Sequence, residues 1–259
     1  MLKYIEVMGK MIPSYGVMIF FGVFLANVIA FRVIKKEKWD INDFIIIEAY
    51  AFLGGFLGAK LLYLLVSIRI IDWSRFFELA YFNALMQGGF VFYGGLIFGV
   101  FAVLLAGKIH GIESGKYIQR FIFLIPFIHA FGRIGCFCAG CCYGIHYEGV
   151  GSVVFPHNSL APHGVHLFPV QLLEAVGLLL ISFTIYCVQR KIGSGKSLGL
   201  YMIFYGMLRF FDEFLRGDVV RGFFGNLSIA QWISVCVVVV GVILLVWPKF
   251  SGTRSIQYQ

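Results

Sequence analysis

Seven predominantly apolar stretches, each close to the length that crosses a lipid bilayer, dominate this sequence: residues 15–33, 45–68, 90–106, 117–135, 169–188, 198–215 and 229–247. A spanning helix needs about 20 such residues. Charged residues make up only 13% of the chain, whereas a soluble domain carries about 25%. This deficit excludes a soluble domain, a disordered chain and a coiled coil, and the helix-length runs differ from the alternating pattern of an outer-membrane barrel. We predict an all-α integral membrane protein with about seven transmembrane helices in a single domain, residues 1–259.

Basic residues indicate which side of the membrane each connection faces. With the N-terminus outside, 12 Lys and Arg residues fall in inner segments and six in outer segments, as the positive-inside rule requires. We therefore expect an outer N-terminus and a cytoplasmic C-terminus. The connection 136–168 has no Lys or Arg and is predicted to form a lid on the periplasmic or extracellular face.

The N-terminal stretch and the net charge support the same view. The first apolar stretch lacks a small-residue cleavage site, so we expect it to remain as a span. The net charge of +8 indicates attraction to anionic lipid rather than to nucleic acid.

Three basic residues, Lys60, Arg133 and Arg209, lie inside the predicted spans. An ionisable side chain in a span costs at least ~2.5 kcal/mol on insertion scales, so it usually faces the bundle interior and marks a functional site. The alternative is structural, either a buried ion pair or a lysine whose ammonium reaches the membrane surface.

The predicted topology brings polar residues from five spans to the outer face of the membrane. Their shared depth depends only on the order of the spans, which makes the set more informative than any single member. The set comprises Tyr15, Tyr93, Arg133, Gln171, Glu174, Arg209, Glu213 and Arg216.

In the sixth stretch, Tyr205, Arg209 and Glu213 are spaced by four residues and share one helix face. Guanidinium groups bind phosphate bidentately and stay charged in a low dielectric. Arg209 and Arg216, the two arginines of this stretch with carboxylate neighbours, are therefore candidates to bind the phosphate of a phospholipid headgroup. The alternative is a pair of structural ion pairs, Arg209–Glu213 and Asp212–Arg216.

Glycine is frequent near the outer ends of two stretches. Residues 88–95 contain four glycines, two of them Gly94 and Gly95, and the fourth stretch ends with Gly132 and Gly135. Small residues allow helices to approach closely, which is one interpretation. The other is unwound backbone whose N–H groups face a lipid headgroup.

Four cysteines, Cys136, Cys138, Cys141 and Cys142, lie within seven residues. Their spacing is not a standard structural-zinc pattern. A disulfide on an oxidising outer face, a reactive thiolate beside Arg133, a metal site and inert packing residues all stay open. The histidines of residues 145–168 form no HExxH arrangement, and we expect no metal there.

The motifs occur in a recognisable order along most of the chain. Gly132-Arg133-Ile134-Gly135-Cys136-Phe137 closes at Tyr143-Gly144, and Tyr205-Gly206-x-x-Arg209-Phe210-x-x-Glu213-x-x-Arg216 follows. Further matching segments are Tyr15-Gly16, residues 57–63, residues 88–95, and His166 with residues 169–174. Together they resemble the motifs of the prolipoprotein diacylglyceryl transferase family.

The resemblance implies that the diacylglyceryl group of phosphatidylglycerol is transferred to the thiol of a lipobox cysteine. This is the first step of bacterial lipoprotein maturation, and it takes place in the cytoplasmic (inner) membrane with the active site towards the outer leaflet. The implied partners are phosphatidylglycerol, prolipoprotein signal peptides and membrane lipids, with no nucleic acid, no metal and no organic cofactor.

The resemblance also implies roles for individual residues. The catalytic residues are Arg133, Arg209, Tyr93, Tyr15 and Glu213. The substrate-binding residues are Tyr205, Gly94, Gly95, Gly132, Gly135, Gly144, Gln171, Glu174, Lys60 and His166.

The sequence departs from the usual family pattern at four positions. Tyr93 stands where His is usual, Lys60 where Arg is usual, Cys136 where Asn is usual, and Cys141 where Glu is usual. Tyrosine has an unperturbed pKa near 10, against about 6.5 for histidine, so the base that activates the thiol stays open. Two other functions also stay open: a diverged enzyme that gives the lipid to another acceptor, and a non-catalytic lipid-binding or thiol-redox membrane protein.

Overall fold

The computed structural model describes residues 4–7, 9–157, 159–218 and 222–246. The chain forms two compact units, one made of residues 1–36 with 118–259 and the other of residues 37–117. Helices dominate both units, and the strands occur only as short two-stranded hairpins in the described residues.

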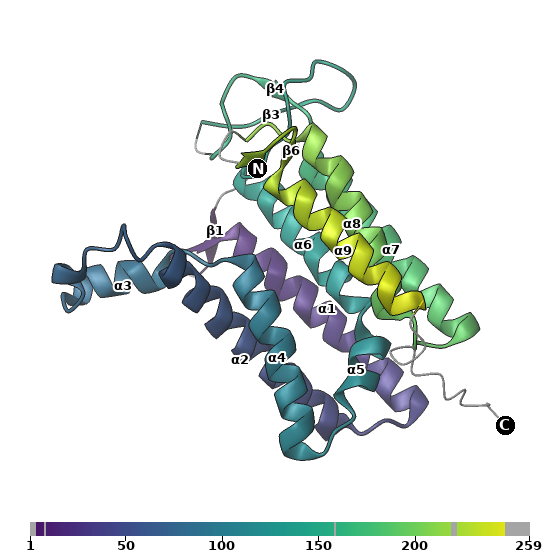
Figure 1. The fold of residues 1–259 in the computed structure, drawn as a ribbon. Coiled ribbons are helices and arrows are strands. Elements are labelled where there is room, and N and C mark those ends of the chain that lie inside the picture. The colour runs from purple at the N-terminus through teal and green to yellow at the C-terminus, as the bar shows by residue number, and fades with distance from the viewer. Residues whose placement is uncertain (1–3, 8, 158, 219–221, 247–259) are drawn as a thin grey trace. The chain divides into compact units, whose positions relative to one another are not determined.

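The first unit contains a row of helices that follow one another in sequence (Figure 1). Each helix packs against the next along the chain, α6 on α7, α7 on α8, and α8 on α9. The unit opens with the antiparallel hairpin of β1 and β2, which leads into α1. The bounds are β1 Tyr4–Val7, β2 Lys10–Pro13, α1 Ser14–Glu37, α5 Ser114–Phe121, α6 Leu124–Ala139, α7 Val170–Ile192, α8 Ser197–Asp212, η2 Glu213–Leu215 and α9 Ile229–Val246.

Four of the described helices, α1, α2 (Ile41–Val66), α7 and α9, are long and apolar enough to cross a membrane. The pair α5 and α6, bent by 52°, would make a fifth if it forms one span. Large apolar side chains such as Phe20, Phe56 and Phe183 are exposed on these helices, as expected of surfaces that face lipid tails rather than water. The chain is therefore a mostly helical, multi-pass membrane protein. Each predicted apolar stretch is mainly helical, and the fourth is divided between α5 and α6.

The fourth predicted stretch differs most from its helix. The chain bends between α5 and α6, and α6 then continues to Ala139. Pro126 causes no break, because a proline in the first turn of a helix displaces no intrahelical hydrogen bond. Residues 136–139, predicted to begin the outer loop, instead form the last turn of α6.

The second unit is built on the close approach of α2 and α4 (Phe92–His110). A Cβ placed on Gly58 would lie 2.2 Å from the Cβ of Phe98, and one placed on Gly94 would lie 2.3 Å from the carbonyl oxygen of Gly58. Glycine is thus required where the two backbones touch. The expectation of unwound backbone is wrong for Gly94 and Gly95, since both lie inside α4.

A short segment between these two helices holds η1 (Trp73–Arg75) and α3 (Leu79–Gln87). The buried ammonium of Lys60 donates hydrogen bonds to the carbonyl oxygens of Leu85 at 2.5 Å and Gly88 at 2.6 Å. These oxygens lie at the C-terminal end of α3, where carbonyls lack helical partners and a cation is favourable. Lys60 therefore caps α3, which explains a positive charge at this depth.

The contact between α2 and α4 predicts a large difference between two glycine substitutions. Gly58→Ala should lower the free energy of unfolding by about 1–3 kcal/mol, because the added methyl group overpacks the interface. Gly99→Ala on α4 is the matched control, since its Cβ would lie 3.5 Å from the nearest atom, an ordinary contact. Thermal unfolding in detergent micelles measures both, and equal effects would contradict the proposed role of the close contact.

Candidate functional site

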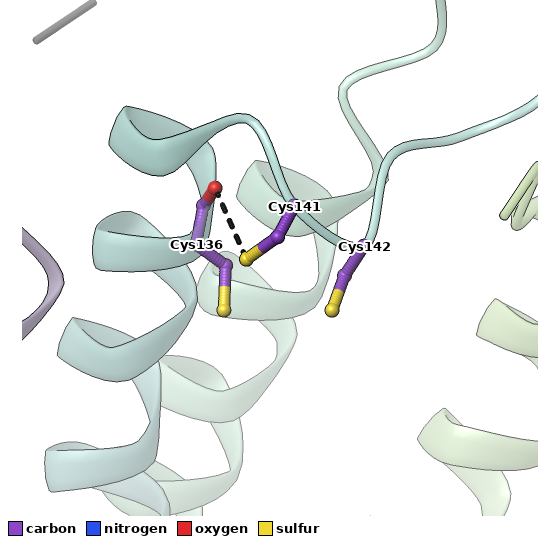
Figure 2. A group of neighbouring side chains, drawn as sticks. All are labelled: Cys136, Cys141 and Cys142. Carbon is purple, nitrogen blue, oxygen red and sulfur yellow. Dashed lines mark hydrogen bonds between the residues drawn. The ribbon is translucent and has the colours of Figure 1, made fainter. Parts of the chain in front are cut away.

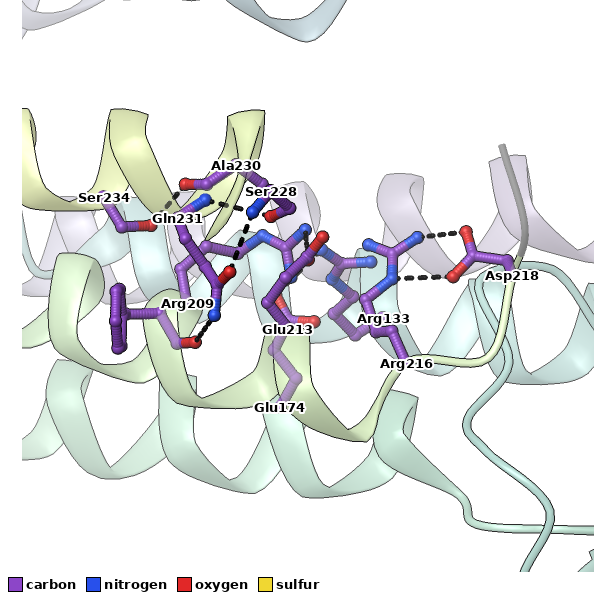
Figure 3. Close-up of polar contacts among 11 residues, drawn as sticks. Arg133, Glu174, Arg209, Glu213, Arg216, Asp218, Ser228, Ala230, Gln231 and Ser234 are labelled. Atoms are coloured by element: carbon purple, nitrogen blue, oxygen red, sulfur yellow. Dashed lines mark hydrogen bonds and ion pairs between the residues drawn. The ribbon is translucent and has the colours of Figure 1, made fainter. Parts of the chain in front are cut away.

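Two buried ion pairs lie in the first unit, one joining α6 to α7 and the other joining α8 to η2 (Figure 3). The Arg133 Nη2 atom of α6 lies 2.8 Å from Glu174 Oε1 of α7. The Arg209 Nη2 atom of α8 lies 2.6 Å from Glu213 Oε2. The arginine side chains are 12% and 14% exposed and both carboxylates 2%, so neither charge is solvated by bulk water and each needs its partner.

Both arginines keep hydrogen-bonding capacity beyond these pairs. Among the described residues, Arg133 Nε and Arg209 Nη1 are buried donors that have no hydrogen-bond partner. Leaving a buried donor unsatisfied costs about 1–3 kcal/mol, and native structures seldom do so without a reason. An anion with several acceptor oxygens would satisfy both guanidinium groups at once.

A third arginine, Arg216, is paired differently from the prediction. Its Nε donates to Asp218 Oδ1 at 2.9 Å, rather than to Asp212. The spacing rule fails because α8 ends at Asp212 and Arg216 adopts an extended conformation after the 3-10 turn η2. Asp212 is buried instead, where the charges of Glu174 and the three arginines Arg133, Arg209 and Arg216 act on its carboxyl.

The remaining predicted residues of this unit surround the arginines. Tyr15 at the start of α1 lies against α6, because a Cβ on Gly135 would be only 3.0 Å from the Cα of Tyr15. Tyr205 packs on the core formed by α6 and α7, and its phenol lies near Arg133. Gly132 lies in the same helix as Gly135, so the expectation of unwound backbone is wrong for these two glycines as well.

The segment after α6 forms a small ordered layer with its own core. Phe155, Ala161 and Leu167 are buried together, and β3 (Val153–Val154) pairs with β4 (His166–Leu167). His166 is exposed in β4, and its Nδ1 lies 3.1 Å from the Oγ of Ser152. The predicted lid is therefore a folded segment.

Backbone contacts fix the base of this segment beside Arg216. Gly144 forms a bridge to Arg216, and a Cβ on Gly144 would lie 2.3 Å from the carbonyl oxygen of Phe168. The flanking N–H of Ile145 donates to Leu215 at 3.0 Å, and the N–H of Gly217 donates to Tyr143 at 3.0 Å. Gly144 is thus needed for close backbone contact.

Four predicted site residues lie in the second unit. Gly94 packs against Gly58 and Gly95 lies beside it on α4, while the Lys60 ammonium caps α3. Tyr93 lies in the first turn of α4, and its side chain lies outside the described part of the structure. A substrate-binding role for these four residues stays a prediction.

The cysteine cluster lies at the C-terminal end of α6 (Figure 2). Gly140 adopts a left-handed conformation with φ 73° and ends the helix. The N–H of Cys141 donates to Cys136 and that of Gly140 to Phe137, at 3.1 and 3.2 Å, which is a Schellman motif. This turn folds the two following cysteines back onto the last helical turn.

Three of the four cysteines meet there. The Sγ atoms of Cys136, Cys141 and Cys142 all lie within 4.8 Å of one another. The cysteines of the described chain are free, so the disulfide, one of the four alternatives, is not formed in this structure. Thiol hydrogen bonds from Cys136 and Cys141, together with the charges of Arg216 and Arg133, lower the pKa of the Cys142 thiol.

Sequence reasoning missed two polar contacts of this site. Asp218, the partner of Arg216, lies two residues further along the chain in a loop. Its closeness in sequence is the one feature that could have indicated this ion pair. Gln171 was predicted as a site residue, but its Nε2 donates to the carbonyl oxygen of Cys141 at 2.8 Å. Gln171 therefore attaches the cysteine turn to the start of α7.

Removal of a buried carboxylate should cost far more stability than removal of an exposed one. Glu174→Ala leaves the Arg133 charge without its partner and should lower the free energy of unfolding by about 3–5 kcal/mol. Glu78→Ala breaks the exposed pair of Arg75 and Glu78, whose side chains are 54% and 53% exposed, and should cost at most about 1 kcal/mol. Thermal unfolding in micelles compares them, and similar losses would contradict the importance of burial.

The sequence of the chain is similar to that of a known protein family along most of its length. The family model described as Prolipoprotein diacylglyceryl transferase matches residues 3–247. A phosphatidylglycerol–prolipoprotein diacylglyceryl transferase of Clostridium tetani is 34% identical over 247 residues, 95% of this chain and 96% of the relative. One from Clostridium perfringens is 31% identical over 253 residues, 96% of each chain. One from Mannheimia succiniciproducens is 29% identical over 240 residues, 90% of this chain and 87% of the relative. The chain belongs to the prolipoprotein diacylglyceryl transferase family.

Proposed function

We propose that this protein transfers the diacylglyceryl group of phosphatidylglycerol to the thiol of a lipobox cysteine in prolipoproteins. The family and the names of the relatives support this activity. The structural observation that carries it is the pair of buried guanidinium groups, Arg133 and Arg209, each with a donor that has no hydrogen-bond partner among the described residues. A phospholipid phosphate has the charge and the oxygens to bind both.

The reaction requires stabilisation of a departing phosphate. The acceptor sulfur attacks the glyceryl carbon, the bond from this carbon to the phosphate oxygen breaks, and glycerol phosphate leaves with the electron pair. Fixed positive charges in a low dielectric stabilise such developing negative charge strongly, because they need not reorganise during the reaction. Glu174 and Glu213 hold the two arginines in place for this task.

Other residues receive supporting roles in this proposal. Tyr15 and Tyr205 orient the headgroup, since both phenol groups lie near Arg133. Tyr93 is a catalytic residue by resemblance, and the base that activates the acceptor thiol stays open. The remaining substrate-binding residues are Lys60, Gly94, Gly95, Gly132, Gly135, Gly144, His166 and Gln171.

The placement in the membrane is also part of the proposal. We infer seven spans with the N-terminus outside, one transmembrane domain for the whole chain, and an active site towards the outer leaflet of the bacterial cytoplasmic membrane. The distribution of basic residues supports this orientation. The continuous family match over residues 3–247 supports the single domain.

Arginine-to-lysine substitutions test the phosphate-binding role. Arg133→Lys and Arg209→Lys keep the charge that pairs with each carboxylate but lose the bidentate donor geometry. Each should lower the rate of transfer by about 10²-fold or more. The assay combines purified protein, phosphatidylglycerol and a lipobox peptide, and mass spectrometry measures the diacylglyceryl adduct.

Arg120→Lys provides the matched control for these variants. Arg120 is also a buried arginine of the first unit, and its Nη1 donates to Gln189 Oε1 at 2.5 Å, away from the proposed site. Its substitution should leave the rate within a few fold of the original. Transfer that survives in both Arg133→Lys and Arg209→Lys would rule out the phosphate-binding assignment.

A further inference from the structure

The three-cysteine group of Cys136, Cys141 and Cys142 has a geometry that helix periodicity and the turn at Gly140 explain together. Cys136 and Cys138 are two positions apart on a helix, so their side chains point in very different directions. The Schellman turn then returns Cys141 and Cys142 to the side of Cys136 (Figure 2). Cys138 is consequently not a member of the group, although it is nearer in sequence.

The backbone at this turn is held in an uncommon conformation. Cys142 has φ 56°, a left-handed value that is unusual for a residue with a side chain. Such strained conformations cluster at functional sites. The left-handed backbone at Cys142 directs a third sulfur into the group.

The separation of the sulfur atoms suits a thiolate-bound metal better than a disulfide. Zinc–sulfur bonds of about 2.3 Å at tetrahedral angles place ligand sulfurs about 3.8 Å apart. The three Sγ atoms already lie within 4.8 Å of one another, so small side-chain movements suffice. A disulfide needs about 2.05 Å between two sulfurs and leaves the third unused.

We propose that Cys136, Cys141 and Cys142 bind one Zn²⁺ ion, whose fourth coordination position takes the thiol of the acceptor peptide. Soft thiolate ligands select zinc over hard cations, and three protein ligands with one open position are typical of catalytic zinc. Cys136 is buried, while Cys141 and Cys142 are only partly buried, so one side of the group stays accessible. The role of this metal in the reaction rests on the transferase function proposed above.

The charges around the group favour this arrangement. Three thiolates and one Zn²⁺ carry a net charge of minus one, and the acceptor thiolate makes it minus two. The positive charges of Arg216 and Arg133 both act on Cys142, so they offset this excess. The same Arg133 belongs to the proposed phosphate site, which brings the bound thiol and the glyceryl carbon to one region.

Zinc would solve the problem of thiol activation. A free thiol with a pKa of about 8.5 is mostly protonated at neutral pH, and a tyrosine with a pKa of about 10 is a weak base there. Coordination to Zn²⁺ removes the thiol proton outright: the S–H bond breaks, a zinc–sulfur bond forms, and the proton passes to water. The sulfur then attacks the glyceryl carbon with its electron pair, and the carbon–oxygen bond to phosphate breaks.

Metal binding to the purified full-length protein tests the site itself. After reduction and removal of metals, the protein should take up one equivalent of Zn²⁺, and Zn²⁺ should raise its melting temperature. Cys141→Ser and Cys142→Ser should each reduce zinc affinity by at least about 10²-fold, and Cys138→Ser, the matched control, should leave it unchanged. Absence of zinc binding by the unaltered chain, or equal binding by Cys142→Ser, would overturn the proposal.

Co²⁺ used in place of Zn²⁺ reports the fourth ligand. A lipobox peptide should intensify the thiolate-to-cobalt charge-transfer band, and the same peptide with Ser in place of its Cys should not. No change with the Cys peptide would overturn the role of the open position. Transfer assays then separate the two proposals: equal rates with and without Zn²⁺ refute only the metal role, whereas no transfer under either condition refutes the proposed function.

Discussion

The need to neutralise fixed positive charge inside an apolar helix bundle governs this structure. Arginine stays protonated under all ordinary conditions, so a buried arginine must be paired within the protein. Arg133 and Arg209 each meet this need through a carboxylate that is itself buried. The first pair links α6 to α7, and the second spans the end of α8, so the charges also fix how these helix ends meet.

The same requirement is met in a different way in the second unit. The ammonium of Lys60 binds backbone carbonyl oxygens at the C-terminal end of α3 in place of a carboxylate. The C-terminal end of a helix supplies unpaired carbonyl acceptors and a partial negative charge, so one cation satisfies several backbone groups. The two units thus illustrate two solutions for a cation at membrane depth, one that retains donors for a ligand and one that stabilises local backbone.

Much of the fold followed from the sequence because a bilayer restricts the choices. Each predicted apolar stretch is mainly helical, since backbone groups in lipid must be satisfied within the segment, although the fourth is divided between α5 and α6. The pair of Arg209 and Glu213 followed from spacing by four residues. The same rule failed for Arg216 because the helix ended before it, and helix ends are set by tertiary contacts that spacing does not encode.

The cysteine group shows a second limit of sequence reasoning. The spacing of its cysteines matches no standard metal pattern, and only the left-handed turn at Gly140 reveals which three sulfurs meet. Glycine was equally ambiguous: Gly94 and Gly135 fit both close packing and unwound backbone, and the structure places both in helices at close contacts.

The contact of Gly144 with Arg216 has a consequence for access to the site. The N–H of Ile145 donates to Leu215 and that of Gly217 donates to Tyr143, and each hydrogen bond contributes about 1 kcal/mol. Both break together if the base of the segment after α6 separates from residues 215–217. Such an opening would also break the backbone bridge between Gly144 and Arg216. The base of this segment therefore acts as an anchor beside Arg216, and in the proposed reaction the acceptor peptide approaches the arginines around this fixed base.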